Sequence, residues 1–108
     1  MQLAVTVLPH YQNDLKDTYP NLARRLKTLA PDLVARNPSL YEIAGQLDKL
    51  LYKFDGTPLR EVLLRHREGL RDLHKSVEEN IANWNLAQAD HLLYQLEDIF
   101  DGIESEFK

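Results

Sequence analysis

Apolar residues recur at alternating steps of three and four positions through most of the chain, and this spacing restricts the fold more than any other feature. It runs through four segments, residues 22–33, 40–54, 59–81 and 86–107. In an α-helix, such steps place the apolar side chains of a segment along one face. The pattern is typical of helices that pack side by side at shallow crossing angles. We therefore expect an all-α fold.

Residues that commonly begin or end helices separate these segments. Prolines that follow capping residues predict helix starts at Thr18-Tyr19-Pro20, Asn37-Pro38 and Thr57-Pro58. Pro31 lies inside the first segment and must bend or end its helix. The segment Phe54-Asp55-Gly56-Thr57 combines a helix end, a turn and the cap of the next helix.

The shortest connection, Asn83-Trp84-Asn85, is typical of the turn between two antiparallel helices. We expect Asn83 to end one helix in the left-handed conformation, Asn85 to cap the next, and Trp84 to pack across the closed end. Because the other connections are also short, neighbouring helices should run antiparallel. The predicted architecture is an antiparallel up-down four-helix bundle with a short N-terminal extension or an extra helix.

Residues 1–18 are less regular than the rest, with β-branched residues first and helical spacing afterwards. We interpret 1–108 as one helical-bundle domain, since 108 residues is the size of a single domain. Residues 1–8 are apolar but lack the basic residues and cleavage site of a signal peptide. We expect a cytoplasmic protein without a membrane span.

Charge is distributed unevenly along the chain. The formal net charge is −4, but residues 78–108 contain eight acidic residues and a single Lys, while residues 1–77 contain twelve basic and nine acidic residues. The acidic balance argues against a nucleic-acid partner, although this holds mainly for the C-terminal part. The chain has no Cys, which excludes thiol catalysis, Cys-ligated metals and disulfides.

The last two expected helices carry more apolar residues than contact with one neighbouring helix requires, with Val62 and Leu64 on one and Leu92 and Ile99 on the other. If part of this stripe is left over from the core, it can bind another protein, or a second copy of the chain, through helix packing. We expect a non-catalytic interaction module, such as an adaptor, a chaperone or a regulatory subunit. The expected apolar contacts are Leu92, Ile99, Phe100, Ile103 and Phe107, and the expected acidic rim is Asp98, Asp101, Glu104 and Glu106.

Motifs of catalytic and metal sites are missing from the sequence. It has no Gly-rich phosphate loop, no nucleophile elbow, no His-Glu-x-x-His and no Glu-x-x-His pair. We therefore expect no cofactor and no metal. His66 falls at an apolar seam position, and its simplest interpretation is a core side chain with one hydrogen-bond partner.

Two pairs of Arg and His on the expected 58–82 helix suggest an alternative to the interaction module. Arg60 and His66 are separated by five residues, and Arg67 and His74 by six. This spacing resembles the motif of HEPN-type ribonucleases, small helical bundles in which about four to six residues separate the Arg from the His. The resemblance implies RNA cleavage by these four residues. The residue after each Arg is Glu, which departs from the common form of the motif.

Overall fold

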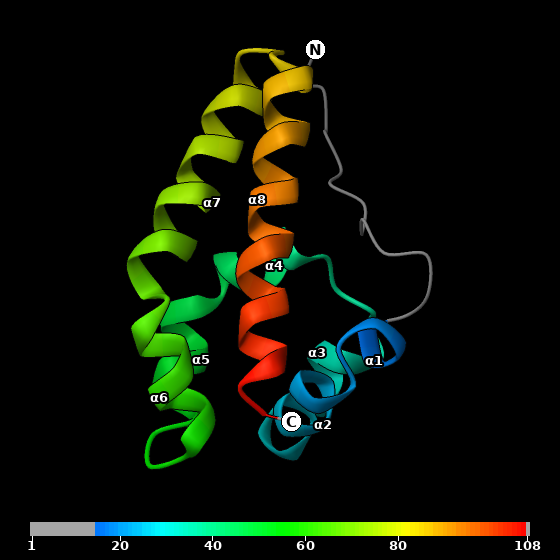
Figure 1. The fold of residues 1–108 in the computed structure, drawn as a ribbon, viewed down its shortest axis with the longest axis vertical. Helices are drawn as coiled ribbons and strands as arrows, with labels where there is room; N and C mark the ends of the chain where they lie inside the picture. The colour runs from blue at the N-terminus through cyan, green and yellow to red at the C-terminus, as the bar shows by residue number, and fades with distance from the viewer. Residues whose placement is uncertain (1–14, 108) are drawn as a thin grey trace.

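The structure is a computed structural model that describes residues 15–107, and its regular elements in this range are all α-helices (Figure 1). They are α1 (Leu15–Thr18), α2 (Pro20–Leu29), α3 (Pro31–Ala35), α4 (Leu40–Gly45), α5 (Leu47–Lys53), α6 (Pro58–Arg65), α7 (Arg67–Ala82) and α8 (Leu86–Ser105). The all-α class is confirmed. The four-helix up-down topology is not, because three of the four expected helices are divided.

The three divisions have different origins. Pro31 begins α3 directly after Ala30, since proline lacks the N–H that a continuous helix requires. Gln46 and His66 divide the other two helices without such a local cause. Their backbones lie at φ/ψ of −101°/12° and −105°/6°, and the His66 N–H donates to the carbonyl of Leu63 at 3.1 Å in a tight turn. The break at His66 lets α6 pack on α5 while α7 packs on α4 and α8.

Several helix starts follow the sequence signals. Thr57 caps α6, since its Oγ1 accepts the N–H of Arg60 at 3.4 Å, and Pro58 follows it as expected. Ser39 caps α4 by accepting the N–H of Glu42 at 3.0 Å. The predicted start at Asn37-Pro38 is therefore wrong: Asn37 lies before the cap at a φ of 51°, and its Oδ1 accepts the N–H of Leu15 at 2.8 Å. This bond joins the first described residue to the connection between α3 and α4.

The turn between α7 and α8 is a Schellman motif centred on Trp84. The N–H of Asn85 donates to the carbonyl of Asn80 at 2.8 Å, and that of Trp84 donates to the carbonyl of Ile81 at 3.0 Å. Trp84, and not Asn83, adopts the left-handed conformation, with a φ of 57°. Asn85 occupies the expected cap position, but its side chain bonds to Asn80 and not to the helix. The expected antiparallel helix pair is present, but the left-handed residue of its turn is Trp84 and not Asn83.

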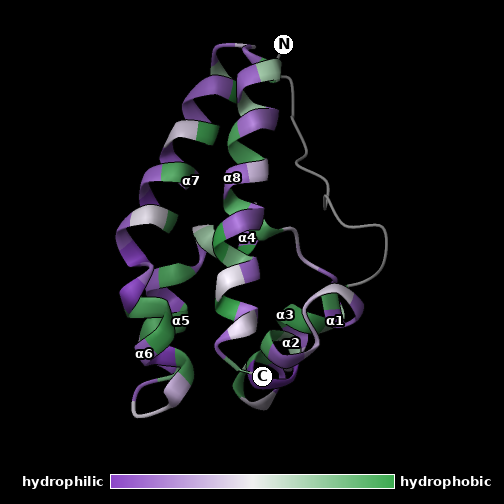
Figure 2. Ribbon diagram, in the orientation of Figure 1, coloured by the Kyte–Doolittle hydropathy of each residue, from purple (hydrophilic) through white to green (hydrophobic). Residues whose placement is uncertain are grey.

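Buried apolar side chains from every described helix form one core, and Figure 2 shows hydrophobic positions recurring along the helices. The largest fully buried residues are Tyr19, Phe54, Phe100, Leu15, Leu22, Leu26, Ile43, Leu59, Leu63, Leu70, Leu96 and Ile103. Each buried Leu or Phe contributes about 1.5–3 kcal/mol of transfer free energy. Within the described range, none of the helices combines the length and apolarity of a membrane-crossing segment. The expectations for residues 1–14 lie outside the described residues, and α1 follows directly as a short helix.

Candidate functional site

The five apolar residues expected to bind a partner lie mostly within the chain's own core. Phe100 and Ile103 are completely buried and Leu92 is 9% exposed, while Ile99 and Phe107 are half-buried against the core. The cause is that α8 contacts α2, α4 and α7 from different sides. The wide apolar face of α8 therefore serves three neighbours within the folded chain.

Glu104, an expected member of the acidic rim, is buried at the start of α2. Its carboxylate accepts the N–H of Asn21 at 3.0 Å, the side-chain Nδ2 of Asn21 at 2.7 Å and the N–H of Leu22 at 2.9 Å. The first turn of α2 has no acidic residue and no side-chain cap of its own. Glu104 therefore supplies the hydrogen-bond acceptors and the negative charge that a helix N-terminus favours.

Glu106 and Phe107 complete the contacts made by the end of the chain. Glu106 pairs with Arg65 and lies 3.0 Å from the Nε2 of His66. The hydrogen bond from His66 holds the pKa of the Glu106 carboxyl below its usual value, and the charge of Arg65 lowers it further. The guanidinium of Arg25 lies 4.3 Å from the centre of the Phe107 ring. We call Glu104, Glu106 and Phe107 the C-terminal clasp, because they join α8 to α2 and to the α6–α7 break.

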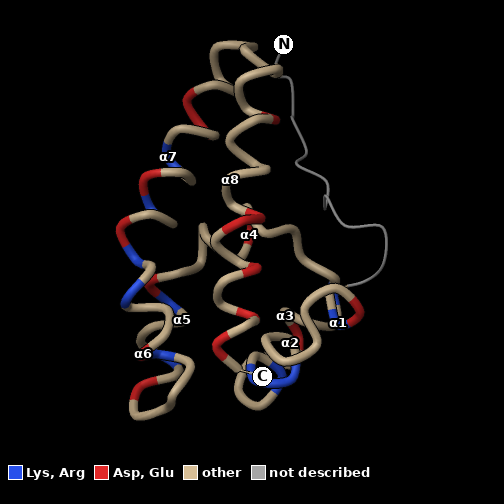
Figure 3. Tube along the Cα trace, viewed as in Figure 1, with Lys and Arg blue, Asp and Glu red and all other residues tan. Residues whose placement is uncertain are grey.

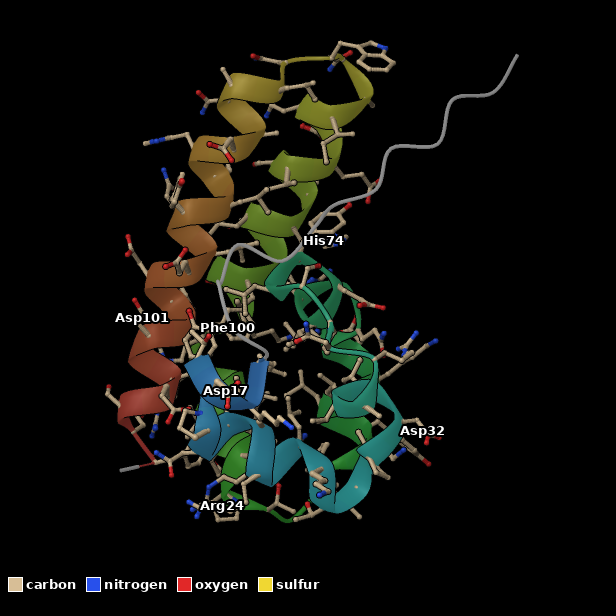
Figure 4. All side chains as sticks on the ribbon, turned by 90° about the vertical axis from the view of Figure 1, so that its right-hand side faces the viewer. Asp17, Arg24, Asp32, His74, Phe100 and Asp101 are labelled. Carbon is tan, nitrogen blue, oxygen red and sulfur yellow. The ribbon has the colours of Figure 1, made fainter. Side chains whose placement is uncertain are left out.

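Asp98 and Asp101 are exposed on α8, and Glu106 is exposed as well, although it pairs with Arg65 and His66. Acidic positions follow the lower half of α8 in Figure 3. In Figure 4, Phe100 points into the body of the molecule while Asp101 lies on the outer side of the helix. The expected rim is therefore divided between Asp98 and Asp101, which face solvent, and Glu104 and Glu106, whose carboxylates bind other parts of the chain.

The first Arg and His pair does not come together. Arg60 donates from Nε to the carbonyl of Leu51 at 3.1 Å and lies 3.6 Å from Asp55, which directs it toward the end of α5. His66 instead contacts Glu106 near the end of α8, and its side chain is 31% exposed. Six positions of a regular helix rotate a side chain by about 120°, and the break at His66 separates the two further.

The second pair, Arg67 and His74, lies along one face of α7, since seven positions return to within about 20° of the starting direction. Arg67 lies 3.8 Å from the carboxylate of Asp48. The His74 ring stacks on Tyr41, with centroids 4.4 Å apart and an interplanar angle of 13°. Burial raises the pKa of the Tyr41 hydroxyl, and the negative charge of Glu78 adds to the effect.

A polar groove of about 640 Å³ runs between α7 and the α4–α5 segment. Gly45 forms part of its wall, and a Cβ built there would lie 2.8 Å from His74 Nε2. The backbone of α4 thus approaches the imidazole closely because residue 45 has no side chain. The lining residues are Ala44, Gly45, Leu47, Asp48, Glu68, Arg71, Asp72, His74 and Lys75. Of the four residues in the ribonuclease resemblance, only His74 lines this groove.

Two large apolar side chains that lie outside the expected contact set are exposed close together in the sequence. Trp84 is 59% exposed and Leu86 is 50% exposed, both at the α7–α8 turn. Trp84 was expected to pack across the end of the hairpin, and that prediction is wrong. Because its φ is positive, its side chain leaves the turn in a direction that ordinary helical geometry does not predict.

In the part of the chain that the structure describes, no three His, Asp or Glu side chains gather in a way that could hold a metal ion. Comparison of the chain with protein-family models, with curated proteins and with solved structures found no significant match in any of the three.

Proposed function

We propose that the chain is a non-catalytic protein-interaction module whose contact surface is the free end of the α7–α8 hairpin. We define this hairpin-end surface as Ala82, Trp84, Leu86 and Ala87, all of which are exposed. In Figure 1 the upper ends of α7 and α8 extend beyond the other described helices. A partner can therefore approach this end without contacting the other described helices.

The observation that carries the proposal is the conformation of Trp84. The C′ position of a Schellman motif is usually glycine, because a side chain there costs about 1–2 kcal/mol in the left-handed region. A tryptophan at a φ of 57° bears this cost while exposing 59% of its surface to water. Neither feature stabilises the monomer. A function that needs the indole at this position accounts for both.

Tryptophan is also the residue most enriched among the side chains that dominate binding energy at protein interfaces. Leu86 extends the apolar surface next to it. Glu78 and Glu79, in the last turns of α7, are exposed and acidic. The complementary partner is a protein with an apolar pocket that admits an indole ring and with basic residues beside the pocket.

The experiment compares capture of a partner by the full chain and by two Trp84 variants. Trp84→Ala and Trp84→Gly should both reduce capture from a native extract at least tenfold, with the fold retained in circular dichroism. Tyr52→Ala is the matched control, because Tyr52 is an 88% exposed aromatic residue on α5. If the Tyr52 variant loses the same partners, or the Trp84 variants retain them, the hairpin-end surface is not the contact site. Sedimentation across concentrations shows separately whether the captured partner is a second copy.

RNA cleavage is the second candidate function, and the polar groove beside His74 is the observation that favours it. His74, Arg71 and Lys75 lie together there, with Glu68 and Asp72 as possible proton acceptors. The test incubates the full chain with single-stranded RNA. Cleavage that is lost in His74→Gln but retained in His66→Gln supports a ribonuclease at the groove. No cleavage by the parent chain removes this candidate.

A further inference from the structure

Helices α1, α2 and α3 enclose a pocket of about 430 Å³ that the interaction surface does not use. One side of α2 forms a wall of the pocket, where Pro20, Arg24 and Lys27 are exposed and Ala23 is buried. Leu15 is buried and Val34 is half-buried, and with Ala23 they make the floor apolar. The volume lies within the range of about 300–1,000 Å³ that is usual for small-molecule sites.

The rim of this pocket is positively charged. Lys16, Arg24 and Lys27 are exposed around it, and the described residues that line it include no Asp or Glu. Among the described residues, none of the three forms an ion pair within 4.0 Å. The acidic residues Asp17 and Asp32 belong to the same helices but do not line the pocket. Within residues 15–107, three positive charges thus surround an apolar floor without forming an ion pair.

Arg24 is held in place by the network that begins at the C-terminal clasp. Its Nη2 donates to the Oδ1 of Asn21 at 2.6 Å, while the Nδ2 of the same Asn21 donates to Glu104 at 2.7 Å. A positioned guanidinium loses less conformational entropy when it binds an anion than a freely rotating one. In Figure 4, Arg24 and Asp32 project from opposite sides of the α1–α3 segment.

We propose that the α1–α3 pocket binds a single-chain anionic amphiphile, with its acid group at Arg24, Lys27 and Lys16 and its hydrocarbon chain on the apolar floor. The floor alone would fit any apolar group, and the rim alone would fit any anion. Their combination within one small pocket selects molecules that carry both. This site is separate from the hairpin-end surface, so either proposal can fail without the other.

The first test measures binding of dodecanoate below its micelle concentration to the full chain by calorimetry. Decanoate should bind several-fold more weakly, since each buried methylene contributes up to about fourfold in affinity. Acetate carries the acid group without the hydrocarbon chain, and dodecyl maltoside carries a hydrocarbon chain of the same length with a neutral head group. Both should bind at least tenfold more weakly than dodecanoate. If acetate binds as tightly as dodecanoate, the rim attracts anions alone and the proposal is wrong.

The second test uses variants of exposed residues, and circular dichroism checks that each variant keeps the fold. Arg24→Gln combined with Lys27→Gln should weaken dodecanoate binding at least tenfold. Lys49→Gln combined with Lys53→Gln removes the same charge from exposed positions on α5 and should leave binding unchanged. An equal loss in both double variants would reduce the effect to overall charge and overturn the proposal.

The third test places a charge inside the pocket. Ala35 is exposed and lines it, so Ala35→Glu should repel the acid group while Ala35→Gln, of similar size, should retain more of the binding. Equal affinities for dodecanoate in these two variants would contradict the proposed location.

The last test distinguishes free acids from lipids and from acidic proteins. Dodecanoate should bind the protein in the absence of vesicles. If the pocket also accepts a lipid, dodecanoate should in addition displace the protein from phosphatidylglycerol vesicles. A poly-glutamate peptide should not displace dodecanoate. Displacement by the peptide at equal charge concentration would assign the rim to acidic proteins and overturn the amphiphile proposal.

Discussion

The carboxylate of Glu104 accepts the backbone N–H of Leu22 at 2.9 Å, across 82 positions of sequence. Through this bond the last helix caps the first long helix of the described chain, which has no cap of its own. The same carboxylate binds Asn21, whose side chain in turn holds Arg24 at the rim of the α1–α3 pocket. The end of the chain thus takes part in building a region formed near its beginning.

Replacing Glu104 should destabilise the fold more than replacing any exposed acidic residue of α8. Glu104→Ala leaves two backbone N–H groups of α2 without their acceptor, and we expect a loss of about 2 kcal/mol in the free energy of unfolding. Urea denaturation measures it. Asp101→Ala is the control, since Asp101 is exposed on the same helix and should change stability by less than about 0.5 kcal/mol. Similar losses in the two variants would show that Glu104 does not cap α2.

Replacing Trp84 by glycine should raise stability, because glycine adopts the left-handed conformation at φ 57° without steric cost. We expect Trp84→Gly to gain about 1 kcal/mol in the free energy of unfolding. Trp84→Ala removes the indole but keeps a Cβ in the same conformation, so it should gain much less. A stability change of the same size in both variants would mean that backbone strain is not the reason. Thermal and urea denaturation can both measure the difference.

Gly45 and His74 should be energetically coupled. A Cβ at position 45 would lie 2.8 Å from His74 Nε2, and the imidazole is held by its stacking on Tyr41. Gly45→Ala should therefore be more favourable in a His74→Ala background than in the parent chain, by about 0.5–2 kcal/mol. A double-mutant cycle by chemical denaturation measures this coupling. Additive effects would indicate that the histidine moves aside freely.

The pair formed by Glu106 and His66 should make stability depend on pH at the acidic end. Because the folded-state pKa of Glu106 is lowered from its ordinary value of 4.5, its contribution is present above that value and is lost as the pH falls through the lowered pKa. Glu106→Gln should be less stable than the parent chain at pH 6, and the difference should disappear on acidification. Asp101→Asn provides the comparison. A parent-to-variant difference that stays constant with pH would exclude this ionisation as its cause.

The sequence identified the acidic C-terminal residues as candidates, but it did not show which of them bind other parts of the chain. Glu104, Asp101 and Asp98 are equivalent in a residue count, and only contacts separate the buried cap from the exposed carboxylates. Similarly, Phe100 and Trp84 are both aromatic. One is completely buried, while the other is mostly exposed because a single backbone residue adopts a positive φ.

The helical class, the helix starts at Pro20 and Pro58, the interruption at Pro31 and the antiparallel pairing across the turn at residues 83–85 follow from the sequence alone. These features depend on interactions within about four residues, such as the Thr57 cap, the proline at 31 and the apolar spacing. The breaks at Gln46 and His66, the cap of α2 by Glu104 and the α1–α3 pocket were decided only by the tertiary structure. They depend on groups that lie far apart in the sequence, and no local pattern records which distant partner a side chain will meet.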